Sequence, residues 1–324
     1  MQISTKMAKQ AFAGFAATLL CTGTAFAQEL TFGYVPASLE YPYNVSTAEG
    51  FSEAAAAAGV KVIVLDSRGS VEKQGNSIDD LLTQNVDAIG FLPLDSVVAE
   101  SFVDKINEAG KPVVAIAAQV GDPNSRAVDD PYPGLSAFVA TDNFKAVYVS
   151  GQMAAGLLPK DRTAKIAVVE GDPAYAVVKL DNYGFNAALK DAGANYEIVA
   201  AQPTNWTPDP GEAVCQNFLI AYPDLDLIFS QADDMAIGCA RAIEAAGSKV
   251  TLIATGGGSK LGRDAILAGE MYGSVWTRPK LLGALMFQAM FEAVTVADTP
   301  KARYVPYDMP QITKETIDAC PEQW

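Results

Sequence analysis

Short apolar runs alternate with Ala-rich helical stretches from residue 30 onward, and this alternation limits the possible folds more than any other feature. The first runs, at 30–36, 61–65, 88–92, 113–117 and 137–140, are almost continuously apolar, as are strands buried on both faces of a parallel sheet. Helices are predicted between them. We therefore predict an α/β lobe in which helices cover both faces of a doubly wound sheet.

The same pattern returns in the second half of the chain, where five more apolar runs alternate with helical stretches. We expect strands at 165–169, 196–200, 227–230, 251–255 and 273–276, and helices at 175–192, 209–221, 233–246 and 259–268. No low-complexity linker separates the halves, so two similar lobes are predicted. Ligands of such folds bind at the carboxyl ends of the strands, which predicts a ligand cleft between the lobes.

Residues 1–27 have the three parts of a secretory signal. Lys6 and Lys9 precede an apolar run at 11–20, and the small-residue site 25–27 predicts cleavage before Gln28. The run is too short to span a bilayer, which takes about 20 residues. We expect a soluble, periplasmic mature protein.

The composition excludes several classes of function. The net charge of −15, without a Lys/Arg cluster, disfavours nucleic acid as a partner. The chain contains no histidine, which excludes Ser-His-Asp and Cys-His catalysis and any zinc site built on imidazole. No cofactor is expected.

Three cysteines follow the signal, namely Cys215, Cys239 and Cys320. An oxidising compartment favours one disulfide and leaves one thiol. Cys215 lies in the predicted helix before the strand at 227–230, and Cys239 lies in the predicted helix after it. A Cys215–Cys239 bond is possible only if both helices lie on one face of the sheet; the alternative is two buried thiols.

Several motifs carry a more specific resemblance through their order and spacing. They are Tyr41-Pro42-Tyr43, Asn85-Val86-Asp87, Pro93-Leu94-Asp95-Ser96, Gly110-Lys111-Pro112, Thr141-Asp142-Asn143, Tyr183-Gly184-Phe185, Tyr222-Pro223-Asp224 and Asp233-Asp234-Met235. This set resembles the ribose-binding-protein-like family, the type I periplasmic solute-binding proteins of sugar ABC importers. The likeness covers essentially all of residues 28–308.

The resemblance implies two lobes joined by three crossings, near Thr141, Thr277 and Asp308. The N-terminal lobe would comprise 28–141 plus 278–308, and the C-terminal lobe 142–277 plus 309–324. It implies a monomer that traps a small polyhydroxyl ligand, needs no cofactor and passes the ligand to an ABC permease in the inner membrane.

Two alternatives to a transport protein stay open. A sensory receptor would present the same closed form to a chemoreceptor or a sensor kinase. An exported carbohydrate-active enzyme would need paired carboxylates such as Asp181 and Asp233. A repressor of the same fold would carry an N-terminal DNA-binding helix pair, and here a signal peptide takes that place.

The resemblance also implies ligand contacts. Tyr41 and Tyr43 would stack on a sugar, or else form a hydrophobic contact at a helix start. Asp233 would bind two hydroxyls, or else cap a helix, and Asp142 presents the same alternatives.

Four departures from the family pattern point to a rebuilt cleft. Ala117-Ala118 stands in place of Asp-Arg, Asp181 in place of arginine, Ala232 in place of asparagine and Gly256 in place of aspartate. Unpaired buried hydroxyls cost about 1–3 kcal/mol each, so a polyol, deoxy or modified sugar is expected rather than an ordinary pentose or hexose. Trp276 would stack on the ligand or fill the hinge core. The remaining residues expected around the ligand are Gln119, Asp172, Tyr175, Gln231, Thr255 and Thr277.

Overall fold

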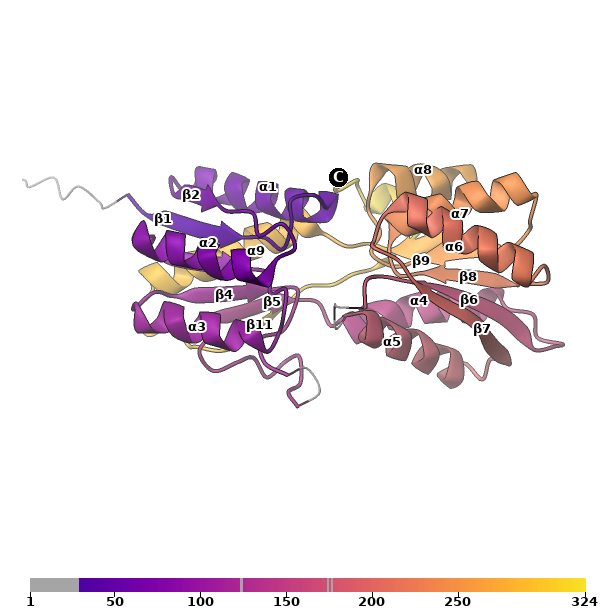
Figure 1. Ribbon diagram of the computed structural model, residues 1–324, viewed down its shortest axis with the longest axis horizontal. Helices are drawn as coiled ribbons and strands as arrows, with labels where there is room; N and C mark the ends of the chain where they lie inside the picture. The colour runs from indigo at the N-terminus through magenta and orange to yellow at the C-terminus, as the bar shows by residue number, and fades with distance from the viewer. Residues whose placement is uncertain (1–28, 123–124, 174, 176) are drawn as a thin grey trace, which may run out of the picture.

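Two α/β lobes lie side by side in the computed structural model, which describes residues 29–122, 125–173, 175 and 177–324 (Figure 1). Each lobe is built on one six-stranded sheet with helices on both faces. This confirms the predicted pair of doubly wound lobes. The lobe that contains β1 is called the N-terminal lobe below, and the other the C-terminal lobe.

The sheet of the N-terminal lobe is entirely parallel, in the order β11-β5-β4-β3-β1-β2. Helices α1 and α9 pack on one face, and α2 and α3 on the other. Phe32 and Phe51 lie in the first of these two cores, and Phe91 in the second. The elements are β1 (Thr31–Val35), α1 (Pro42–Ala57), β2 (Lys61–Val64), α2 (Val71–Thr83), β3 (Ala88–Phe91), α3 (Val98–Glu108), β4 (Val113–Ile116), β5 (Ala137–Ala140), α9 (Pro279–Thr295) and β11 (Arg303–Pro306).

The sheet of the C-terminal lobe has the order β12-β10-β9-β8-β6-β7, and only β12 runs antiparallel to its neighbour. Helices α4 and α5 cover one face, and α6, α7 and α8 the other. The elements are α4 (Asn143–Leu157), β6 (Ala164–Glu170), α5 (Val177–Asp191), β7 (Tyr196–Pro203), α6 (Pro208–Ala221), β8 (Leu227–Ser230), α7 (Asp233–Ala246), β9 (Thr251–Ala254), α8 (Lys260–Ala268), β10 (Gly273–Val275), β12 (Gln311–Thr313) and the short 3-10 helix η1 (Ile317–Ala319).

The sequence did not indicate the two edge strands β11 and β12. Each has four residues or fewer, and both are rich in polar residues or proline, so no apolar run marks them. β11 pairs in parallel with β5, and β12 pairs antiparallel with β10. One short stretch of chain thus supplies an edge strand to each lobe.

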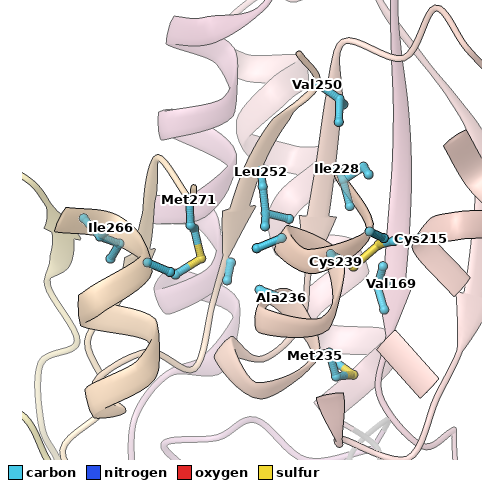
Figure 2. Packing of buried hydrophobic residues seen from close by; sticks show 14 of the residues in the cluster. Val169, Cys215, Ile228, Met235, Ala236, Cys239, Val250, Leu252, Ile266 and Met271 are labelled. Atoms are coloured by element: carbon cyan, nitrogen blue, oxygen red, sulfur yellow. A yellow bond between two sulfur atoms is a disulfide. The ribbon is translucent and has the colours of Figure 1, made fainter. Parts of the chain in front are cut away.

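Cys215 and Cys239 are joined by a disulfide between α6 and α7, which pack on the same face of the sheet. Figure 2 shows the bond among buried side chains that include Val169, Ile228 and Met235. Cys320 is buried and carries a free thiol. The bond therefore ties together two helices that already share one core.

The chain passes between the two sheets at three places, between β5 and α4, between β10 and α9, and between β11 and β12. At the second and third places the Arg278 guanidinium lies 5.4 Å from the centre of the Trp276 ring and 5.8 Å from that of Tyr307. It also donates to the Asp308 carbonyl. Arg278 thus connects two of the three crossings.

Candidate functional site

A hollow of about 440 Å³ lies between the lobes, where the carboxyl ends of strands from both sheets meet. Loops after β3, β4 and β5 form the wall on the N-terminal lobe, and the first turns of α4 and α5 form the facing wall. Three of the residues predicted from the sequence, Gln119, Asp142 and Tyr175, belong to this lining. The volume suits a small ligand.

The lining is mostly apolar on the side of the N-terminal lobe. Leu94 comes from the loop after β3, and Ala117 and Ala118 come from the turn after β4. Ala117 has a φ of +60°, a left-handed conformation that costs an alanine roughly 1 kcal/mol. Val128 and Phe138 complete this surface, which we call the apolar floor: Leu94, Ala117, Ala118, Val128 and Phe138.

The charged side chains among the described lining residues already have partners within their own lobe. Asp95 accepts hydrogen bonds from the backbone N–H groups of Val97 and Val98, both at 2.9 Å. Arg126 pairs with Asp130 at 2.8 Å. These charges hold the loops in place, so they are only partly available to a ligand.

Asp142 lies at the first crossing and caps α4. Its carboxylate accepts from the Lys145 backbone N–H at 3.1 Å and pairs with the Lys145 ammonium at the same distance. The cap predicted as an alternative is therefore present. Because Asp142 also belongs to the lining, one carboxylate both begins the helix and faces the hollow.

Two tyrosines and one aspartate, Tyr41, Tyr175 and Asp172, follow strands that end at the cleft. Burial raises the pKa of Tyr41, and Asp172 and Glu40 raise it further. Burial raises the pKa of Tyr175 to about 12, with smaller contributions from Tyr41 and Asp172. Tyr41 follows β1 and Tyr175 follows β6, so the two rings come from different lobes, and the charge of Asp172 raises the pKa of both.

Trp206 packs against Tyr175. The two rings meet edge to face, with their centres 6.2 Å apart. A side chain at position 171 would collide with the Trp206 ring, which explains the glycine there. Trp206 thus fixes the loop that carries Asp172 and Tyr175.

Asp233 does not belong to the lining of the hollow. It is 1% exposed, accepts a hydrogen bond from the Ser274 hydroxyl at 2.7 Å and another from the Gly258 backbone N–H at 3.2 Å. Burial raises its pKa to about 7, although these hydrogen bonds act in the opposite direction. Asp233 therefore connects α7 to β10 and to the turn after β9, inside the C-terminal lobe.

Four further predicted residues also lie within the C-terminal lobe. Gln231 accepts from the Gly171 N–H at 3.0 Å and donates to the Val178 carbonyl and the Asn182 side chain, both at 3.1 Å. Asp181 is 3% exposed, and burial raises its pKa well above the usual range. Thr255 is buried, and Gly256 adopts a φ of +65° in the following turn.

The last three predicted residues lie toward the crossings and helix α1. Trp276 donates its indole N–H to the Pro321 carbonyl at 3.2 Å and packs beneath Arg278, and the Thr277 hydroxyl donates to the Gly257 carbonyl at 2.8 Å. Burial raises the pKa of Tyr43 to about 12, against the effect of a hydrogen bond with Tyr307. The structure thus separates Tyr43 from Tyr41, two residues earlier.

A family model described as a periplasmic binding protein domain matches residues 32–297. The chain belongs to this family. The resemblance inferred from the sequence motifs is confirmed.

Relatives of this binding protein extend over most of its length. The ribose import binding protein of Bacillus subtilis is 29% identical over 266 residues, which cover 81% of this chain and 81% of that protein. The D-allose-binding periplasmic protein of Escherichia coli is 28% identical over 288 residues, covering 87% and 90% of the two chains. The structure of a Mycobacterium smegmatis protein in complex with β-D-fucofuranose has a TM-score of 0.79 at 26% identity and covers 90% of this chain and 93% of that one.

Sequence reasoning missed several lining residues of this binding protein. Leu94, Val128, Phe138 and Phe144 line the hollow, yet each resembles an ordinary core or helix residue in the sequence. Leu94 follows a predicted strand and Phe144 lies near a crossing, whereas no sequence signal marks Val128, in the loop before β5, or Phe138, within β5. Within the described residues, no group of three or more acidic or cysteine side chains is arranged to hold a metal ion. In the same part of the chain, no helix combines the length and the apolar character needed to cross a membrane.

Proposed function

We propose that this binding protein captures a sugar, polyol or modified sugar between its lobes and delivers it to the permease of an ABC importer. The observation that carries the proposal is the hollow of about 440 Å³ at the facing carboxyl ends of the two sheets. Ligand capture is then the whole activity, without turnover. The names of the relatives, which are binding proteins for ribose and D-allose, support this class of ligand.

The proposal also covers export of the chain and the boundaries of the two lobes. Residues 1–27, outside the described residues, would direct export and be removed before Gln28, leaving a periplasmic monomer. The lobes would be 28–141 plus 278–308, and 142–277 plus 309–324. Closure would bend the three crossings, and Arg278 would make two of them bend together because it contacts both.

In this proposal the ligand contacts come from the residues that face the hollow and the cleft. The rings of Tyr41 and Tyr175 offer flat faces to C–H groups, as aromatic side chains do in ligand sites. Gln119, Asp142 and Asp172 supply polar atoms. The buried side chains of Gln231, Asp233, Thr255 and Thr277, with the turn at Gly256, would hold these loops in position from within the lobe.

The apolar floor narrows the class of ligand. A hydroxyl pressed against Leu94, Ala117 and Ala118 would lose its hydrogen bonds to water without replacement, at about 1–3 kcal/mol. A C–H face or a methyl group would lose nothing there. We therefore expect a ligand with a deoxy carbon or a modified position, and the fucofuranose of the Mycobacterium smegmatis complex is a deoxy sugar.

A thermal-shift screen of residues 28–324 tests the function. The ligands are matched pairs that differ by one hydroxyl, such as D-galactose with D-fucose and L-mannose with L-rhamnose, together with polyols and amino acids. A ligand at 1,000 times its Kd stabilises the folded state by about 4 kcal/mol, which raises Tm by several degrees. Stabilisation by carbohydrates, and more by the deoxy member of a pair, is expected. Stabilisation by amino acids alone would overturn the proposal.

Calorimetric titration of the best ligand then tests the site. Tyr175→Ala removes an aromatic wall of the hollow and is expected to weaken binding at least about tenfold, the equivalent of 1.4 kcal/mol. Tyr272→Ala is the matched control, because Tyr272 is exposed and outside the lining. Equal affinities for the two variants would remove Tyr175 from the site.

A further inference from the structure

We propose that residues 320–324 form a strap that joins the two lobes along one side of the cleft and limits how far they separate. Three crossings connect the lobes covalently, and the strap would be a fourth connection without covalent bonds. The proposal concerns the ligand-free protein, so it goes beyond ligand capture. It rests on contacts that the strap makes to each lobe.

The strap is attached to the C-terminal lobe at several points. The Gln323 N–H donates to the Gly258 carbonyl at 2.8 Å, and the Trp324 carbonyl accepts from the Lys260 N–H at 2.8 Å. The Pro321 carbonyl accepts from the Trp276 indole at 3.2 Å. At its start, the Cys320 carbonyl accepts from the Arg263 guanidinium. The strap therefore belongs structurally to this lobe.

The strap also reaches helix α1 of the N-terminal lobe. The Ser46 hydroxyl donates to the Gln323 carbonyl at 2.8 Å, although the two residues are 277 positions apart. The Trp324 ring meets the Tyr43 ring at 84° with centres 6.2 Å apart. Both Ser46 and Tyr43 belong to α1, which packs on the sheet of the N-terminal lobe.

Gln323 is the residue of the strap whose backbone bonds to both lobes. Its N–H is bonded to one lobe, and its carbonyl is bonded to the other. Ser46 is 1% exposed, so its hydroxyl would have to exchange this bond for water when the lobes move apart. Because the attachments to the C-terminal lobe are more numerous, opening should break the contacts at α1 and leave the strap on the C-terminal lobe.

The strap and the hollow lie on different sides of the cleft. The end of the chain, marked C in Figure 1, lies between α1 and α8. The hollow is lined instead by loops next to α3 and by the first turns of α4 and α5, and no residue of the strap belongs to its lining. The strap would thus close the α1 side and leave the hollow side for entry of the ligand. It also explains why Tyr43 packs against Trp324.

Small-angle scattering of the ligand-free protein tests the strap. Ser46→Ala and Trp324→Ala are made singly and together in the full mature chain. The control is Ser52→Ala on the same helix, whose hydroxyl bonds only within α1, to the Ala48 carbonyl. Circular dichroism and Tm establish that each variant is folded.

The double variant is expected to raise the ratio of open to closed protein about tenfold and to increase the radius of gyration, with smaller increases for each single variant. The control should match the wild type. If the double variant and the wild type scatter identically, the strap does not restrain the lobes. Because no ligand is present, this result would leave ligand capture untouched, just as a failed ligand screen would leave the strap untouched.

Discussion

The loops that follow the strands at the cleft differ between the two lobes. In the N-terminal lobe the loops after β3 and β4 present an apolar surface, and the charges beside it, Asp95 and Arg126, are held by local partners. In the C-terminal lobe the loops after β8 and β9 are fixed from inside by buried polar side chains, chiefly Gln231 and Asp233. A disulfide further ties the helices of the C-terminal lobe together.

The difference shows that polar residues at the ends of strands can bond within their own lobe. Asp233 is the most obvious sugar-binding carboxylate in the sequence, yet its oxygens bond to Ser274 and Gly258. The C-terminal lobe should therefore depend more on buried polar bonds and on its disulfide, whereas the N-terminal lobe has buried Gln74 behind the loop after β3 and relies mainly on core packing. Four measurements test this contrast.

Among the substitutions at constant pH, removal of the disulfide should have the largest effect on stability. The bond closes a loop with a sequence separation of 24, for which chain entropy predicts a contribution of about 3.5 kcal/mol. The double variant Cys215→Ala/Cys239→Ala should lower the Tm of the C-terminal lobe, followed by calorimetry. The unfolding transition of the N-terminal lobe should keep its temperature, because the disulfide lies outside that lobe. An unchanged thermogram would refute the greater dependence of the C-terminal lobe on its cross-link.

Asp233→Ala should come next, with a loss of about 3 kcal/mol. The substitution leaves the Ser274 hydroxyl and the Gly258 N–H buried without partners, and each such group costs about 1–3 kcal/mol. The matched variant in the other lobe is Asp95→Ala, which removes an exposed carboxylate that accepts from the Val97 and Val98 N–H groups, bonds worth about 1 kcal/mol. Urea unfolding measures both, and equal losses would contradict the contrast.

The ionisation of Asp233 should also make stability depend on pH. Burial raises its pKa from 3.8 to about 7, so the folded state holds this proton more tightly than the unfolded state does. Its stabilising effect is complete below pH 4 and is lost as the pH rises toward 7, at about 1.4 kcal/mol for each pH unit. Asp233→Asn should flatten this slope in thermal scans between pH 4 and 8. The exposed control Asp318→Asn should retain the slope of the wild type.

The smallest effect is expected in the N-terminal lobe, at Ala117. Its φ of +60° suits glycine better than alanine, so Ala117→Gly should gain up to about 1 kcal/mol. The neighbouring variant Ala118→Gly should instead lose about 0.5–1 kcal/mol, because glycine adds freedom to the unfolded chain. Chemical denaturation distinguishes the two, and losses at both positions would show that Ala117 is not strained.

The sequence was sufficient for the architecture because each buried strand of a parallel sheet leaves a continuous apolar run. Ten predicted strands correspond in position to β1–β10, whereas the short strands β11 and β12 left no such signal. The strongest local patterns therefore located the cores and the edge strands β2 and β7, whereas the edge strands β11 and β12 depended on tertiary pairing.

The site was less accessible to sequence reasoning because the direction of a side chain depends on distant partners. Asp233 turns inward to groups 25 and 41 positions away, which no local pattern shows. Tyr41 and Tyr43 looked equivalent in the sequence, but the second meets Trp324, far along the chain. Gln119 and Tyr175 were located correctly in the lining because they follow strands that end at the cleft.

The positions of β11 and β12 have a consequence for the timing of folding. Both strands come after every other strand of their sheets, so neither lobe can complete its edge until nearly the whole described chain has been synthesised. Contacts so distant in sequence also form late, because long loops must close first. A chain exported as we propose would thus stay incompletely folded during synthesis, in the state that passage across a membrane requires.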